Sequence, residues 1–357
     1  MRRLLISVGL AWLLSWTPVG TVRAVEPWAD AALKVREGLE IWLDASVQQA
    51  ARAAIGAEPL EIDAPTGVAY DAARKYGFTH VAVSKSPTFH TQDDVAYFRF
   101  RGIDQHLEAD LRSGEEGPGL EFDEISVFVV AAPFHNDGGF QGMLALHTLG
   151  EADYRTGLNI DLGPSSTPRF SAVNVEGAGS SGGKNLRTGR GDFSKFHRLC
   201  VTSRVGKGGV VLYVNGKREG QRERAAGTLK ADRMILGGRY TGDDRGVRCF
   251  FAGDIAEVLV YDRVLSDDQR KQVDAYLAAK YDSVDRLPLP AELAGSRWLV
   301  AVQSPPPVQM HVPGFTVREL PVELPNINNV LYREDGVLVA LAYDGNIYLL
   351  RDTDGDD

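Results

Sequence analysis

The stretch Val210-Val-Leu-Tyr-Val-Asn215-Gly216 indicates the class of fold. A short run of β-branched and aromatic residues leads directly into Asn-Gly, the dipeptide that accepts positive φ at both central positions of a tight hairpin turn. We therefore expect residues 210–214 to form one strand and the residues from Arg218 onward to form the returning strand.

Similar short apolar runs occur on both sides of this hairpin, with turn residues between them. The clearest are residues 38–43, 96–101, 125–131, 196–203 and 255–261. Long helical periodicity is nearly absent, and 38 glycines suit a chain with many turns. This pattern predicts an all-β sandwich or barrel. Residues 159–190, with their Gly-Pro-Ser-Ser and Gly-Ser-Ser-Gly-Gly segments, are predicted to form a loop.

One helix is clearly marked in the sequence. Ser266 is a suitable N-cap, and Gln269 stands three residues later, in the capping-box position. Spacings of three and four residues place the apolar side chains that follow on one helix face, which we expect to pack on the sandwich. These side chains are Val273, Tyr276, Leu277 and Tyr281.

The first 24 residues have the pattern of a secretion signal. Arg2 and Arg3 precede an apolar run over residues 4–16, and small residues follow at Val22 and Ala24. The run is about 13 residues long, whereas a membrane-spanning helix needs about 20. We predict cleavage after Ala24, a secreted or periplasmic location, and no transmembrane anchor after cleavage. A formal charge of −9 argues against a nucleic-acid partner, because the average surface repels phosphates.

A Pro-rich segment divides the rest of the chain. Pro288 and Pro290 precede three consecutive prolines at 305–307, a composition that favours extended backbone. We predict a sandwich domain over residues 25–284, a linker over 285–310 and a β-meander over 311–357. The meander has strand candidates at residues 328–333, 337–343 and 346–351, and it is too small to be stable alone.

Several segments of the chain resemble a known family. Residues 196–203 (FHRLCVTS) and 211–217 (VLYVNGK) are similar to the central hairpin of laminin-G-like domains, and residues 253–266 (GDIAEVLVYDRVLS) resemble their closing strand and capped helix. Residues 38–46 and 96–104 resemble the first two strands. The resemblance covers about residues 37–281. It implies an antiparallel, concanavalin A-like jelly-roll β-sandwich with a short capping helix.

The tail is similar to another family. Residues 312–320 (VPGFTVREL) and 341–356 (LAYDGNIYLLRDTDGD) resemble the first blade of the sorbosone/glucose-dehydrogenase-like propeller of large secreted planctomycete proteins. About one blade is present, whereas a propeller closes with about four or more. The sequence has no Cys-x-x-Cys-His haem motif, so neither haem nor dehydrogenase activity is carried over to this chain.

The sequence shows no clear catalytic constellation. Glu121 and Asp123 would share one strand face, as the paired carboxylates of a glycoside hydrolase do. A further acid on that face is missing, since Glu124 would point to the opposite side. No Ser-His-Asp arrangement or nucleophile elbow emerges. We therefore expect this chain not to be an enzyme.

Two polar loops are the candidates for ligand binding. Loops at the rim of a rigid sandwich are where binding residues gather, and an aromatic ring beside polar groups suits a sugar. The alternative is that both loops are ordinary turns, since Asn, Asp and Gly are the usual turn residues. The candidate residues are His135, Asn136 and Asp137 in one loop and Tyr240, Asp243 and Asp244 in the other.

Calcium is the one cofactor that the sequence suggests. Asp352, Asp354 and Asp356 alternate as at the start of a calcium loop, although the further acidic ligand of such a loop is missing; a solvated acidic tail is the alternative. Cys200 and Cys249 are free to form one disulfide in an oxidising compartment, and two separate thiols are the alternative.

The leading functional hypothesis is a non-catalytic module that binds a glycan or another cell-surface polymer. It follows from the laminin-G resemblance and the absence of catalytic acids. The second hypothesis is that the chain is the accessory N-terminal part of a truncated sorbosone/glucose-dehydrogenase-like oxidoreductase. The third is a structural spacer domain without a ligand.

Overall fold

The computed structural model describes residues 25–73, 76–79, 82–114, 117–242, 246–284, 287–289, 324, 327–342 and 345–351. The chain divides into two compact units, residues 1–295 and 296–357. The predicted signal peptide lies outside the described residues.

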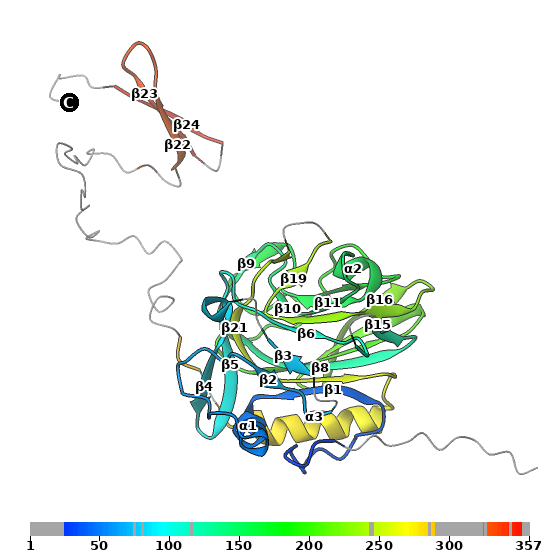
Figure 1. Ribbon diagram of the computed structural model, residues 1–357. Coiled ribbons are helices and arrows are strands. Elements are labelled where there is room, and N and C mark those ends of the chain that lie inside the picture. The colour runs from blue at the N-terminus through cyan, green and yellow to red at the C-terminus, as the bar shows by residue number, and fades with distance from the viewer. Residues whose placement is uncertain are drawn as a thin grey trace, which may run out of the picture. The chain divides into compact units, whose positions relative to one another are not determined.

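The larger sheet of the first unit has eight strands, which Figure 1 shows across the middle of the molecule. Seven of the strands form one continuous hydrogen-bonded series, the main path of the sheet. The eighth strand, β1, pairs with β21 outside this series. In spatial order the main path is β16 (Lys217–Arg224), β15 (Gly206–Val214), β14 (His197–Ser203), β8 (Ile125–Pro133), β21 (Ala252–Tyr261), β5 (Val95–Arg101) and β4 (Thr88–Gln92), and β1 is Leu39–Asp44.

The smaller sheet has five strands. In spatial order these are β13 (Asn174–Gly177), β11 (Leu158–Asp161), β10 (Gly142–His147), β18 (Arg233–Leu236) and β6 (Leu107–Asp110). Four two-stranded pairs complete the unit: β2 (Ala69–Tyr70) with β3 (Gly77–Phe78), β7 (Leu120–Phe122) with β17 (Leu229–Ala231), β9 (Asn136–Gly138) with β12 (Ser165–Thr167), and β19 (Arg239–Tyr240) with β20 (Val247–Arg248).

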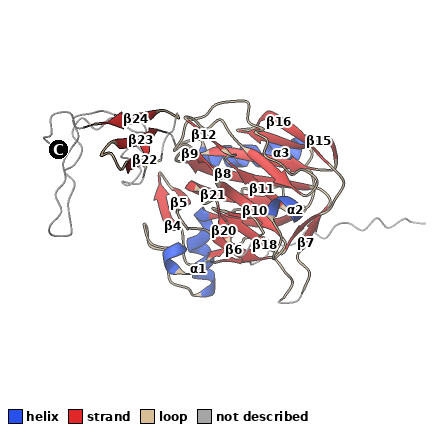
Figure 2. Cartoon of the chain, turned by 90° about the horizontal axis from the view of Figure 1, so that it is seen from above, coloured by secondary structure: helices blue, strands red, loops and turns tan. Residues whose placement is uncertain are grey.

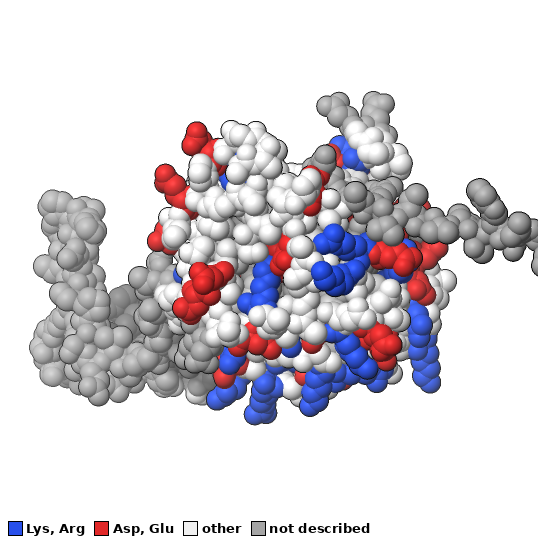
Figure 3. All heavy atoms as spheres, turned by 90° about the horizontal axis from the view of Figure 1, so that it is seen from below, with Lys and Arg blue, Asp and Glu red and all other residues white. Residues whose placement is uncertain are grey.

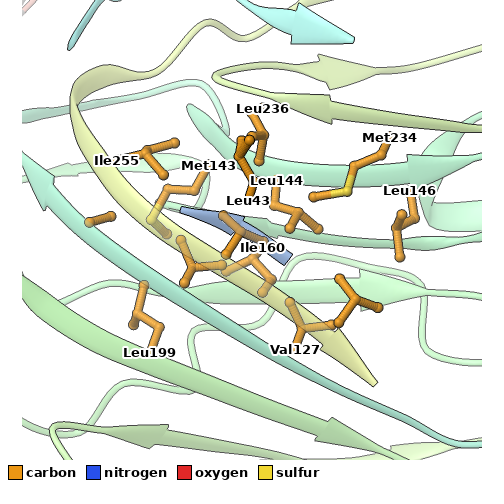
Figure 4. Close-up of a cluster of buried hydrophobic side chains, with 14 of the residues drawn as sticks. Leu43, Val127, Met143, Leu144, Leu146, Ile160, Leu199, Met234, Leu236 and Ile255 are labelled. Atoms are coloured by element: carbon orange, nitrogen blue, oxygen red, sulfur yellow. The ribbon is translucent and has the colours of Figure 1, made fainter. Parts of the chain in front are cut away.

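The two sheets stack face to face around an apolar core. Inward side chains of both sheets meet there, among them Val127, Leu144, Ile160, Leu199 and Met234, which Figure 4 shows in close-up. Every pairing between named strands in the described part of the chain is antiparallel. The predicted all-β, antiparallel jelly-roll sandwich is confirmed.

The hairpin and the capped helix occur where the sequence predicts them. Asn215 and Gly216 both have positive φ, 50° and 75°, between the paired residues Val214 and Lys217. Helix α3 (Asp267–Tyr281) has a complete capping box, in which the Ser266 side chain accepts from the Gln269 N–H. α3 packs on the outer face of the larger sheet, on the side away from the smaller sheet, and buries a second apolar cluster there (Figures 1 and 2).

Several elements were not predicted. The segment 159–190 is not a plain loop, because it contains most of β11 and all of β12 and β13. Its strands are short and rich in Asn, Asp and Gly, the residues that mark turns. The helices α1 (Gln48–Ile55) and α2 (Asp153–Thr156) and the 3₁₀ turns η1 (Ala45–Val47) and η2 (Val83–Lys85) are too short to give a helical periodicity.

The second unit contains a three-stranded antiparallel meander in its described part. Its strands are β22 (Ile327–Tyr332), β23 (Leu338–Ala342) and β24 (Ile347–Leu350).

Cys200 and Cys249 are both free, so the disulfide that the sequence permits is not formed. Cys200 is buried in the interior of strand β14, opposite Phe128 and Tyr213 on the neighbouring strands. Cys249 is half-buried just before β21, and its carbonyl accepts from the Gly142 N–H. None of the helices described has the length and apolar character needed to cross a membrane.

Candidate functional site

One of the predicted ligand residues, Asn136, has a structural role. Asn136 is buried, and its amide donates to the Leu162 carbonyl at 2.9 Å and to Thr167 Oγ1 at 3.1 Å. Its Oδ1 accepts from the Gly138 N–H at 2.9 Å. These bonds hold β9 against β12, and they use both polar groups of the Asn136 side chain. Its polar groups satisfy a turn, as Asn side chains commonly do.

The other predicted residues are placed as follows. His135 Nδ1 lies 3.1 Å from a carboxylate oxygen of Asp137, whose side chain is half-exposed. Tyr240 is partly buried, and its ring stacks on His147 with centroids 4.3 Å apart. Asp243 and Asp244 lie outside the described residues, as do the predicted calcium ligands Asp352, Asp354 and Asp356.

The most elaborate polar arrangement on the sandwich surrounds Arg239, on the outer face of the five-stranded sheet. Its Nη2 donates to Asp153 Oδ1 at 2.8 Å and its Nε donates to Asp153 Oδ2 at 3.1 Å. Its Nη1 donates to Asp161 Oδ2 at 2.8 Å and to Glu176 Oε2 at 3.2 Å. The Asn174 amide donates to the same two carboxylate oxygens of Asp161 and Glu176. We call these five residues the Arg239 cluster.

Strand alternation positions this cluster. Successive side chains of a strand point to opposite faces, so the inward residues Leu158, Ile160 and Val175 leave their neighbours on the outer face. Those outward neighbours include Asp161 on β11 and Asn174 and Glu176 on β13. Asp153 comes from α2, and Arg239 begins β19, the strand that Figure 1 shows beyond the outer face of this sheet.

Glycine at position 142 makes room for the arginine. A Cβ atom at this position would collide with the Arg239 side chain and with the carbonyl of Gly238. Because β10 begins at Gly142, the start of this strand can lie directly against β19.

The electrostatics of the cluster are those of a closed site in which one guanidinium faces three acids. Burial raises the pKa of Asp161 to about 7, although Arg239 and Asn174 act against this rise. Burial also opposes the charge of Arg239, but hydrogen bonds and attraction from Asp153 outweigh it and raise the arginine's pKa. Asp153 and Asp161 are fully buried, and Arg239 and Glu176 are nearly so. The guanidinium therefore serves as a fixed cation at the centre of three acids.

Partly exposed aromatic rings lie next to the cluster. The Arg239 guanidinium is 5.4 Å from the ring centroid of Phe140, a non-glycine residue with a φ of 61°. Tyr240 follows Arg239 in the chain, and its N–H donates to Asp153 Oδ2 at 3.2 Å. Phe140 comes three residues after Asp137 of the first predicted loop, and Tyr240 begins the second, so the two segments approach each other at Arg239.

Two buried polar atoms near Tyr240 are not hydrogen-bonded to any described residue. They are Nε2 of His147, which lies under the Tyr240 ring, and Oδ1 of Asn159. The amide nitrogen of Asn159 donates to Asp153, the same carboxylate that receives the Tyr240 N–H. Both atoms are closed off from the surface, so one donor or acceptor of each side chain is left for a buried water molecule. We call His147, Asn159, Tyr240 and Phe140 the Tyr240 site.

Sequence reasoning found Tyr240 but missed the rest of this site. The signal that was present is the alternation of apolar and polar residues over 158–161 and 173–176. Glu121 and Asp123, the two acids that were weighed as a hydrolase pair in the sequence analysis, lie elsewhere. Glu121 is exposed and bonds Lys230 at 2.8 Å, and Asp123 is exposed and accepts from Thr228.

This geometry belongs to the concanavalin A-like class of jelly-roll sandwiches. A family model of laminin G type, described as the concanavalin A-like lectin/glucanases superfamily, matches residues 132–269, which include the Arg239 cluster and the Tyr240 site. No curated protein matches the sequence.

Several solved structures are similar to this chain. Trypanosoma rangeli sialidase is 12% identical with a TM-score of 0.43, and the match covers 73% of this chain and 36% of the sialidase. Domain 4 of AbnA, an extracellular arabinanase from Geobacillus stearothermophilus solved with arabinotriose, is 14% identical with a TM-score of 0.41, covering 65% of this chain and 95% of that domain. The match spans about a third of the length of the sialidases.

Proposed function

We propose that this chain is an exported, non-catalytic carbohydrate-binding module and that its ligand binds at the Tyr240 site. The observation that carries the proposal is that two partly exposed aromatic rings, those of Phe140 and Tyr240, lie beside the Arg239 cluster. An aromatic ring packs on the apolar face of a sugar, while nearby donors and acceptors bind its hydroxyls. The match to a lectin and glucanase superfamily supports the same ligand class.

A glycan array with the full chain tests this proposal, because it presents neutral and charged sugars together. Tyr240→Ala should lower the affinity for the best neutral glycan by about tenfold, as expected for the loss of one aromatic contact. Tyr70→Ala, at another partly buried tyrosine on β2, is the matched control and should bind like the wild type. Absence of binding to every glycan, or equal losses in both variants, would contradict the proposal.

Export is the second part of the proposal, and it rests on the pattern of residues 1–24. The full chain expressed in a bacterium with a general secretion system should appear outside the cytoplasm with Val25 as its first residue. N-terminal sequencing of the exported protein checks this. A protein retained in the cytoplasm with residues 1–24 intact would contradict it.

Glycoside hydrolysis is a second candidate function, because Asp161 and Glu176 share two hydrogen-bond donors and Asp161 has a pKa raised to about 7. A pair of acids with one raised pKa is the pattern of such enzymes. Binding without catalysis is favoured because Arg239 occupies the space between the carboxylates and both are buried. An assay of reducing-sugar release from the glycans that bind separates the two functions. Release that is lost in Asp161→Asn would establish the hydrolase.

A further inference from the structure

The basic residues of this acidic chain are concentrated in one segment. Between Lys184 and Arg224 the sequence has eleven Lys and Arg against three Asp and Glu, whereas the whole chain has a formal charge of −9. This segment includes β14, β15 and β16, and β16 is the edge strand of the larger sheet. A charge asymmetry of this kind marks a surface where ions of the opposite sign gather.

Some of these basic side chains have structural roles and do not contribute to an open surface. Arg187, Arg222 and Arg224 donate to backbone carbonyls, and Arg198 pairs with Asp274 and Asp282. The remaining exposed ones are Lys184, Arg190, Arg204, Lys207, Lys217 and Arg218. We call these six residues the β16 basic strip.

Two of the three acids in the segment already have partners. Glu219 Oε2 accepts from the backbone N–H groups of Thr188 and Gly189, at 2.8 and 2.6 Å. Asp192 pairs with Arg169 at 2.8 Å. Only Glu223 is left as an exposed acid of this segment without an ion pair among the described contacts. The exposed charges of this segment are therefore almost entirely positive.

The strip follows β16 along its length. Lys217 and Arg218 begin the strand, and Lys184 reaches its middle, where Nζ donates to the Gln221 carbonyl at 3.3 Å. At the far end Arg224 pairs with Gly206, which stands between Arg204 and Lys207. An eight-residue strand spans about 26 Å. Figure 3 shows Lys and Arg side chains gathered in a row along one margin of the face that it presents.

Protection of a sheet edge does not explain this strip. Charged residues often guard an edge strand against pairing with another chain. Here the segment before β14 already lies against β16. A Cβ atom on Gly220 would collide with the Leu186 carbonyl, and the Glu219 carboxylate accepts from the backbone N–H groups of Thr188 and Gly189. An edge strand that is already covered needs no charged residues for protection. Acidic residues would also protect it as well as basic ones do, so protection does not explain the positive sign.

We infer that the β16 basic strip binds a linear anionic polysaccharide, carrying carboxylate or sulfate groups, along the strand. The inference rests on the proposed glycan-binding function and adds a second, charge-selective surface to it. A polysaccharide is favoured over a nucleic acid because it is the ligand class already proposed for this chain, and duplex DNA is a competitor in the test below. An extended strand with basic side chains at its start, middle and end suits a chain of regularly spaced negative charges.

The test compares the full chain with two double variants of equal charge change. Immobilised protein is titrated with polygalacturonate, dextran sulfate and uncharged dextran, at low and at physiological salt. Wild-type protein should bind at least one of the two anionic polymers and not dextran, and its affinity should fall as salt rises. Lys217→Glu with Arg218→Glu should lower this affinity by about tenfold or more, because it reverses two of the six positive charges of the strip.

Lys34→Glu with Lys85→Glu, at exposed positions outside the strip, should retain wild-type binding. The carboxylated and sulfated polymers distinguish the two sources of negative charge. Binding of neither polymer would overturn the inference, as would equal losses in both variants or competition by duplex DNA as strong as that by dextran sulfate at equal charge. If Tyr240-dependent binding of neutral glycans persists in that case, the proposed function stands and only the basic strip fails.

Discussion

Arg239 shows how a single side chain can organise a buried polar face. Its guanidinium pairs with carboxylates from α2, β11 and β13, and these are fixed before any ligand arrives. Replacing only the cation leaves several buried acids without compensation, which is far more costly than losing an exposed pair.

Arg239→Met should therefore lower the free energy of unfolding by about 3–5 kcal/mol. Arg263→Met is the control, because Arg263 pairs with Glu37 and Asp262 at a partly exposed position; its loss should be about 1 kcal/mol or less. Urea denaturation followed by circular dichroism measures both changes. Equal losses in the two variants would show that the Arg239 cluster is not the rigid centre described above.

A buried carboxyl gives stability a pH dependence. Burial raises the pKa of Asp71 to about 7, and its Oδ1 accepts from the backbone N–H groups of Trp42 and Ala73. The unfolded carboxyl has a pKa of about 4. Between about pH 4 and pH 7 the folded state therefore binds more protons at this carboxyl than the unfolded state does. The contribution of Asp71 to the free energy of unfolding is fully present below about pH 4 and declines as the pH rises through about 7.

Asp71→Asn removes the titration and keeps an oxygen acceptor. The wild type should lose stability relative to this variant as pH rises from about 4 to 8, by an amount on the order of 1–4 kcal/mol. Denaturation curves of both proteins across this range measure the difference. A difference that is independent of pH would contradict the raised pKa.

The residues of the site were harder to predict than the strands. Asn136 has the chemistry of a ligand residue and of a turn residue, and only its three-dimensional partners decide between them. The Arg239 cluster joins residues up to 86 positions apart. The sequence shows that such polar residues alternate with apolar ones, but the pairing of β11 with β13 and the position of β19 determine which of them meet.

At the scale of elements, helix α3 is attached to the sandwich by a buried acid. Glu257 on β21 accepts from Trp42 Nε1 at 2.7 Å, from the Tyr281 hydroxyl at 2.7 Å and from Lys280 Nζ at 2.9 Å. The Ser266 capping box and the apolar stripe could be predicted from the sequence. This polar attachment could not, because a lone Glu within an apolar strand has no local partner.

Glu257→Ala should destabilise the protein by about 3–5 kcal/mol, since it leaves the buried donors of α3 and β1 without an acceptor. Ser266→Ala should cost about 1 kcal/mol, the usual value of an N-cap. Urea denaturation ranks the two variants. A larger loss for Ser266→Ala would mean that the helix depends on its own cap more than on its attachment to the sheet.

At the scale of the whole molecule, the two units differ in how they bury their apolar residues. The sandwich covers both faces of its larger sheet, one with the smaller sheet and the other with α3. The meander leaves large apolar side chains exposed, among them Leu331 at 72% and Ile347 at 65%. Leu331 pairs with Val339 on β23, and Ile347 pairs with Leu341, two residues further along the same strand. These side chains therefore lie on one face of the sheet.

An exposed apolar sheet face of this kind favours association. The full chain should self-associate with increasing concentration, and Leu331→Lys with Ile347→Lys should shift it towards the monomer, because two charges make burial of this face unfavourable. Sedimentation velocity over a concentration series measures the effect. Val205→Lys with Leu149→Lys, at exposed apolar positions on the sandwich, is the matched control and should associate like the wild type. A wild type that stays monomeric at every concentration would contradict this prediction.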